Sequence, residues 1–204
     1  CTIFMKRAIS FKCYRVKQSF SLFDLLYKKE RKGKVMYKKG DYVVKMPEGI
    51  CKIENIGHPD TTGMNKTKEY YILVPINEKT SKIYLPVDYV DGRIRNMISK
   101  EEAIQLIKSI PNITETEIHN EKMREQEYKA AILSGDNKKI VSIIKLIYTR
   151  KQERIKQGKK STVTDDKYFK QAEDVLFSEL SFVLDIPKEN MVQFIEDMIK
   201  ADLL

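Results

Sequence analysis

The sequence predicts an α+β protein of two domains, a small antiparallel β-barrel followed by an all-α bundle of about five helices. Two observations lead to this prediction. Between residues 36 and 91, short runs of β-branched and aromatic residues alternate with turn residues, and from Ser99 onward apolar residues recur at helical spacing. The chain has 204 residues, of which 42% are hydrophobic and 33% charged, a composition that suits two small folded domains.

The first 35 residues stand outside this pattern. They contain ten Lys and Arg against two acidic residues, and their apolar cluster at 19–27 lacks the length and cleavage site of a secretory signal. A basic tail or a mitochondrial-type presequence is one interpretation. The run 28–35 before Met36 would be encoded by purine-rich codons, as a bacterial ribosome-binding site would be. We therefore expect translation to start at Met36 and residues 1–35 to be a leader outside the fold.

Four segments are predicted strands, at 41–44, 49–54, 70–76 and 82–86, with turn residues between them. Proline donates no backbone hydrogen bond, so strands containing Pro75 and Pro86 should end there or lie at an edge. Four or five short strands in about 55 residues are typical of a small SH3- or Tudor-like barrel. We assign this domain to residues 36–91 and a linker to Gly92–Asn96.

The helical domain is expected over residues 97–204. Ser99 and Glu102 form a capping box at the start of a first helix, which Pro111 stops. Further helices are predicted at about 119–133 and 137–157, the latter from apolar residues at i, i+3, i+4 and i+7. Thr164 is the expected cap of a fourth helix, and a fifth begins at Asp185 with Pro187 and runs through Ile199.

Catalytic and metal-binding patterns are scarce. His58 and His119 have no neighbouring nucleophile motif, and the three cysteines contain no CxxC pair. Asp165 and Asp166 could be read as metal ligands, but at a helix start they fit capping and dipole roles better. We expect no enzyme activity, no metal and no cofactor. The apolar stretches are too short for a membrane-spanning helix, so no membrane partner is expected and the cytoplasm is the default location.

The net charge of +9 is unevenly distributed. The leader holds +8 of it, and the remaining 169 residues are close to neutral. Within this neutral part, residues 138–160 contain nine basic residues and one acid. Lys145 lies in one stripe of the predicted helix, and Arg150 and Arg154 are stacked at i, i+4 on a neighbouring one. Such a stripe can track nucleic-acid phosphates, and the alternative is a solvated helix face.

Four segments in the β-rich part resemble the RNA-polymerase-interaction module of CarD/CdnL-type bacterial transcription regulators, which is related to a module of the transcription-repair coupling factor. They are Tyr37-Lys-Lys-Gly-Asp-Tyr-Val-Val44, Glu48-Gly-Ile-Cys-Lys-Ile-Glu54, Tyr71-Ile-Leu-Val74 and Ile83-Tyr-Leu-Pro86. In the helical part, Leu133-Ser-Gly-Asp136, Arg150-Lys-Gln-Glu-Arg154 and Ala172-Glu-Asp-Val-Leu176 extend the match. The resemblance covers essentially residues 36–204.

The resemblance implies a non-enzymatic bacterial regulator, monomeric and located with RNA polymerase on the nucleoid. Its β-module would dock on the polymerase β subunit by pairing strand edges, and its helical domain would contact promoter DNA at the upstream edge of the bubble, changing open-complex stability. The polymerase-facing strand corresponds to Lys82, Ile83, Tyr84 and Leu85. Arg124, Arg150 and Arg154 match basic positions of the DNA-facing domain, to which the stripe adds Lys145 and Lys151.

One departure concerns the minor-groove wedge. Members of the family place a Trp near the start of the second helix of the helical domain, and this chain has no Trp. Glu121, which follows a shared Asn120, aligns with that position, and a carboxylate would be repelled by DNA. Ile118 and Met123 are the apolar candidates for the wedge. The alternatives are therefore an adaptor that binds polymerase or another protein without wedging DNA, and an RNA-binding protein.

Overall fold

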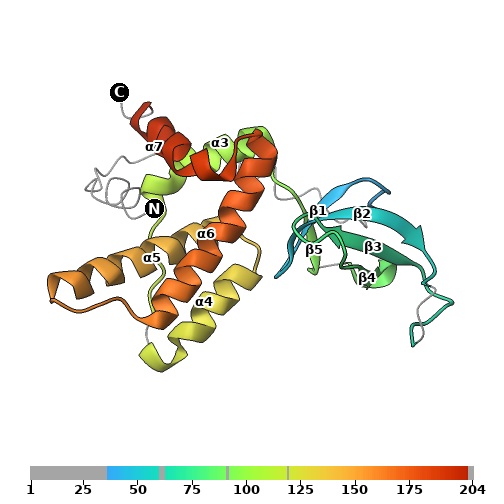
Figure 1. Cartoon of the computed structure of the whole chain (residues 1–204), viewed down its shortest axis with the longest axis horizontal. Coiled ribbons are helices and arrows are strands. Elements are labelled where there is room, and N and C mark those ends of the chain that lie inside the picture. Colours follow the sequence, from blue (N-terminus) through green and yellow to red (C-terminus); the bar gives the residue numbers. More distant parts are fainter. Residues whose placement is uncertain (1–35, 60–62, 91, 119, 202–204) are drawn as a thin grey trace, which may run out of the picture.

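The computed structural model describes residues 36–59, 63–90, 92–118 and 120–201. The expected leader and His119 lie outside these residues. A β-rich part and a helical part lie at opposite ends of the molecule, joined through the segment that precedes the first labelled helix (Figure 1).

In the part of the chain that the structure describes, the strands form one curled five-stranded antiparallel sheet, in the order β4-β3-β2-β1-β5. Its strands are β1 (Tyr42–Lys45), β2 (Gly49–Gly57), β3 (Tyr70–Pro75), β4 (Ile83–Pro86) and β5 (Ile94–Asn96). A register shift between Ile53 and Asn55 interrupts the pairing of β2 with β3. Such an irregularity bends a sheet, which agrees with the half-barrel shape.

Alternating residues of these strands fill a separate small core that includes Val43, Cys51, Ile53, Tyr71 and Leu73. The Tyr71 hydroxyl accepts a hydrogen bond from the Tyr37 backbone N–H at 3.2 Å, so this buried tyrosine keeps a polar partner. Both prolines that we expected at strand ends lie there: Pro75 ends β3 and Pro86 ends β4.

The fifth strand corrects one sequence-based assignment. Residues 92–96 were expected to form a linker, but Ile94–Asn96 is β5 and pairs with Val43, Val44 and Lys45 of β1. A three-residue strand has too short a pattern to be recognised alone, and its pairing depends on residues about 50 positions earlier.

Among the described residues, the helical part contains five α-helices: α3 (Lys100–Ser109), α4 (Arg124–Leu133), α5 (Asn137–Lys156), α6 (Val163–Leu184) and α7 (Met191–Ala201). The short 3-10 helices η2 (Ile110–Asn112), η3 (Glu121–Met123) and η4 (Lys188–Asn190) adjoin α3, α4 and α7. In the β-rich part, η1 (Val87–Tyr89) follows β4. The α5 and α6 helices pack along each other at the centre of this part (Figure 1).

Two predicted helix caps had different outcomes. The capping box is confirmed: the Ser99 hydroxyl accepts the Glu102 N–H at 3.1 Å, and the Glu102 carboxylate accepts the Ser99 N–H at 2.8 Å. The cap at Thr164 is wrong, because α6 begins two residues earlier and Thr162 accepts the Asp165 N–H at 3.0 Å. Thr164 directly precedes Asp165, whereas Thr162 lies three residues before it, and both are residue types that cap helices.

The helical core is built from the apolar faces of α3 to α7. Its fully buried members include Ile107, Tyr128, Ile143, Leu180 and Ile195. The curled sheet with its own core, followed by this helical core, confirms the predicted fold class, a Tudor-like β domain followed by a helical domain. Within the described residues, no helix combines the length and the apolar character needed to cross a membrane.

An ion pair with a buried carboxylate and a partly exposed arginine joins the two parts. Arg95 of β5 makes two 2.7 Å hydrogen bonds to Glu179 of α6, whose side chain is only 2% exposed. Arg95 also donates to the Gly135 carbonyl at 2.7 Å, and Asn137 and the Ile98 N–H donate to Glu179. A buried carboxylate needs such partners, so these contacts fix how the sheet meets the helices.

Candidate functional site

The first candidate surface is the edge of the sheet at β4. Among the described strands, β4 pairs with β3 alone, with Tyr84 opposite Ile72. Leu85 is buried in the core of the sheet and Ile83 packs against that core. Because successive side chains alternate in direction, Lys82 and Tyr84 face away from this core. Of the four residues predicted to face the polymerase, two therefore offer side chains and two offer mainly backbone.

Lys82 already has an intramolecular partner. Its ammonium lies 2.6 Å from the Glu54 carboxylate of β2, and both side chains are about half exposed. The hydrogen bond to Glu54 raises the pKa of Lys82. An exposed pair of this kind is weakly held, so either member can exchange its partner for another charged group.

The second candidate surface begins where η3 and α4 meet the later turns of α5. Arg150 donates to both oxygens of Glu121, with Nη1–Oε1 at 2.7 Å and Nη2–Oε2 at 2.8 Å. Arg124 donates from Nη1 to Oε2 of the same carboxylate at 2.9 Å. Two arginines predicted to contact DNA thus converge on one carboxylate, which we call the arginine clamp (Arg124, Arg150 and Glu121).

A buried acid lies beneath the arginine clamp. Asp165 of α6 is fully buried, accepts a hydrogen bond from the Tyr128 hydroxyl at 3.1 Å and lies 3.5 Å from Arg124 Nε. Asp165 Oδ2 and the Nε atoms of both arginines are buried without a hydrogen-bond partner among the described atoms. Asp165 therefore acts as an internal counter-charge that holds cationic groups at this end of the helices.

The arginine clamp shifts several pKa values. Hydrogen bonds from Arg150, and secondarily Arg124, hold the pKa of Glu121 below its usual range. The same contact with Glu121 raises the pKa of Arg150. Burial raises the pKa of Tyr128, and the nearby Asp165 charge raises it further. These three groups therefore keep one charge state near neutral pH: Glu121 is ionised, Arg150 is cationic and Tyr128 is a hydrogen-bond donor.

Lys145 is not available to a ligand. Its side chain is buried, and its ammonium donates to the carbonyl oxygens of Ile110 (3.2 Å), Pro111 (3.3 Å) and Ile113 (2.5 Å). These carbonyls lie where α3 and η2 end, and a cation there also complements the helix dipole. Lys145 follows the helical stripe identified from the sequence, but that stripe turns inward here, so we no longer propose it as a DNA contact.

Lys151 and Arg154 are partly committed to other groups. The Lys151 ammonium lies 2.6 Å from Asp166 and 4.9 Å from the centre of the Phe169 ring. Arg154 donates from Nε to the Lys160 carbonyl at 2.9 Å, which fastens the loop between α5 and α6. Asp166 therefore has an ion-pair role, and neither Asp165 nor Asp166 shows a metal-ligand arrangement.

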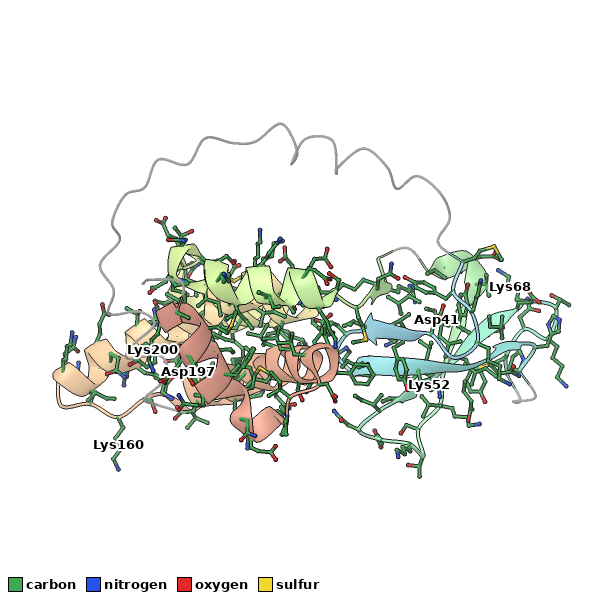
Figure 2. All side chains as sticks on the ribbon, turned by 90° about the horizontal axis from the view of Figure 1, so that it is seen from above. Asp41, Lys52, Lys68, Lys160, Asp197 and Lys200 are labelled. Atoms are coloured by element: carbon green, nitrogen blue, oxygen red, sulfur yellow. The ribbon has the colours of Figure 1, made fainter. Side chains whose placement is uncertain are left out.

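The loop after α5 forms a basic tip, which we define as Lys156, Lys159 and Lys160 with the apolar Ile155 and Val163. All three lysines are exposed, and Ile155 and Val163 are 54% and 86% exposed. Figure 2 shows Lys160 projecting from the end of the helical part that is farthest from the sheet. Lys159 donates to the neutral Gln157 side chain at 3.1 Å, so its charge is not offset there. Exposed lysines of this kind contribute to a long-range positive potential.

The two wedge candidates differ in exposure. Ile118 is half-buried and packs against the helical core. Met123, in η3, is 42% exposed and lies two residues after Glu121. An apolar side chain must be free to leave the protein surface before it can enter a groove, so Met123 is the better of the two candidates.

The described residues offer little for catalysis. No group of three or more His, Cys, Asp or Glu side chains is placed to hold a metal ion in that part of the chain. His58 contacts the Lys68 carbonyl at 3.1 Å, in an exposed loop. Burial raises the pKa of the Cys51 thiol to about 11, so this cysteine stays protonated near neutral pH.

Comparison with known families agrees with the two-part architecture. The model of the CarD-like/TRCF RID domain matches residues 37–98, and the model of the CarD C-terminal domain matches residues 104–196. No curated protein matches the chain. The two matched domains define a transcription-associated, RNA-polymerase-interacting protein. The chain belongs to the CarD/CdnL-type family, whose known members act by binding.

Sequence reasoning missed the role of Glu121. It identified Arg124 and Arg150 separately and expected Glu121 only to repel DNA. The spacing of Glu121 and Arg124 at i, i+3 could have suggested a pair. The Glu121–Arg150 contact joins residues 29 positions apart and depends on how α4 packs against α5, which no local pattern reveals.

Proposed function

We propose that this protein binds the β subunit of RNA polymerase through β4 and promoter DNA through the far end of its helical part, and so changes the stability of the open complex. The observation that supports this most directly is the position of two accessible surfaces on a chain of this family. The outer edge of β4, which pairs with no other described strand, lies toward one end of the molecule, and the basic tip lies at the other (Figure 1).

The polymerase contact is edge-strand pairing. β4 has backbone donors and acceptors on the side away from β3, and residues 82–85 would align a strand of the β subunit there. Tyr84 would contribute side-chain contact area next to the paired backbones. Pro86, which has no N–H, ends the stretch that can pair.

The DNA contact combines two kinds of cation. The lysines of the basic tip supply salt-dependent attraction to the phosphate backbone. Arg124, Arg150, Lys151 and Arg154 lie closer to the body of the domain and supply directional hydrogen bonds to individual phosphates. Met123 is the proposed apolar contact with the minor groove. Because one chain carries both surfaces, a monomer is sufficient for this function.

The deciding experiment measures the lifetime of open promoter complexes formed by bacterial RNA polymerase holoenzyme with and without the full chain. We expect the lifetime to change when the protein is present. Tyr84→Ala should abolish both this effect and co-purification with polymerase. The charge reversals Arg154→Glu and Lys160→Glu, made together, should abolish the effect while co-purification persists.

An adaptor without DNA contact is the second candidate. It is favoured by the arginine clamp, in which both arginines already pair with Glu121 and Arg124 also lies beside Asp165, so that two carboxylates offset the two cations. In that case the wild-type protein would bind polymerase but leave the lifetime unchanged, and the double charge reversal would have no effect. This result would remove the DNA contact from the proposal and retain the polymerase contact.

A further inference from the structure

The carboxylate in the arginine clamp occupies a position suited to a phosphate. Three guanidinium N–H groups from two helices converge on its two oxygens at 2.7, 2.8 and 2.9 Å. Arginine forms the same bidentate arrangement with carboxylates and with phosphates, because both present two oxygens at similar separation. The donor set is therefore not specific for a protein carboxylate.

The three residues of the clamp differ in how firmly they are held. The Arg124 and Arg150 side chains are only 19% and 24% exposed, whereas that of Glu121 is 59% exposed. Asp165 holds Arg124 from below at 3.5 Å. Glu121 belongs to η3, a single short turn. An incoming anion would therefore find both arginines in place, and Glu121 is the group that can rotate away.

We propose that Arg124 and Arg150 form a site for one DNA phosphodiester group, and that the Glu121 carboxylate fills this site in the unbound protein and is displaced when DNA binds. Glu121 is then an internal competitor of DNA. This inference rests on the proposed DNA contact and specifies how one part of it works.

Displacement of Glu121 by a DNA phosphate should change how the DNA-binding constant depends on salt concentration. When a phosphate replaces Glu121, the freed carboxylate regains its own cation from solution, which offsets part of the counterion release from DNA. Removing the carboxylate removes this offset. The slope of log binding constant against log salt concentration should then become steeper by about one.

The test is binding of the full chain to promoter duplex DNA over a series of KCl concentrations. Glu121→Gln keeps the shape of the side chain and removes its charge, and Glu127→Gln is the matched control, since Glu127 is an exposed carboxylate on α4, the helix that follows η3 directly. We expect Glu121→Gln to bind about fivefold more tightly than wild type. Glu127→Gln should show a much smaller gain.

A double variant links the effect to the arginines. If Glu121 competes at this site, the gain should disappear in Glu121→Gln/Arg150→Gln, relative to Arg150→Gln alone. Circular dichroism of each variant checks that the helices remain folded. Equal gains for Glu121→Gln and Glu127→Gln, or a gain that survives loss of Arg150, would overturn the competitor role while leaving the DNA contact intact. Absence of DNA binding in every variant would instead reject the DNA contact and, with it, the competitor.

Discussion

The middle and the end of α5 carry similar basic residues with opposite availability. In the middle, Lys145 is buried against carbonyl oxygens, and Arg150 and Lys151 are paired with Glu121 and Asp166. At the end, Lys156 and the two lysines of the following loop are exposed to solvent. The difference shows that a run of basic residues in a sequence indicates a positive surface potential only where no internal acidic group or buried carbonyl oxygen binds the side chains. Part of the charge counted in the sequence is used to hold the helices together.

The largest effect is expected from removing Lys145, which tests whether the buried lysine is structural and the exposed lysines are not. Lys145→Met keeps the length of the side chain but leaves three carbonyl oxygens without their donor. We expect the free energy of unfolding to fall by about 3 kcal/mol. Urea unfolding followed by circular dichroism measures it, with Lys156→Met as the control, expected to change stability by less than about 0.5 kcal/mol. Equal stability of the two variants would show that Lys145 has no structural role.

The basic tip should show the reverse behaviour. Replacing Lys156, Lys159 and Lys160 with Gln removes three exposed cations, so we expect DNA affinity to fall about tenfold at low salt and the salt slope to decrease by up to about three. Stability should change little. Affinity measured over a KCl series checks both numbers. An unchanged slope would mean that the tip does not approach the phosphate backbone.

The smallest expected effect is a pH dependence of the free energy of unfolding, to which the ion-paired Glu121 should contribute and the exposed lysines of the basic tip should not. The pKa of Glu121 is depressed in the folded protein, chiefly by Arg150. Its contribution to stability is therefore present above the unfolded pKa of about 4.3 and is lost as pH falls through the lower folded value. We expect less than about 1 kcal/mol, because the carboxylate is largely exposed.

Unfolding titrations of wild type and Glu121→Gln between about pH 6 and pH 3 provide the measurement. The difference in stability between the two proteins should shrink below about pH 4.3. The same comparison with Lys156→Gln should give a pH-independent difference in this range. A parallel pair of curves for Glu121→Gln would contradict the ion pair with Arg150.

Local features of the fold were predictable from the sequence, and contacts between distant segments were not. The capping box at Ser99 and the prolines at strand ends depend on neighbouring residues, and both predictions are confirmed. The β5 strand depends on pairing with β1, and it was missed. For the candidate site, helical spacing predicted a basic stripe along α5. It did not reveal that α3 ends against Lys145 or that Glu121 reaches Arg150, because both contacts depend on how the helices pack.

The Arg95–Glu179 ion pair has a consequence for how the two ends of the molecule act together. Arg95 belongs to the sheet and Glu179 to α6 of the other part, so their ion pair holds the two surfaces at a fixed separation instead of leaving them joined by a flexible linker. Under the proposed function, binding of polymerase at β4 sets the effective concentration of the basic tip near DNA. That concentration is high at one spacing between the two binding sites and negligible at others. Promoters that present DNA at that spacing from the polymerase docking point would be selected by distance alone, without any base being read.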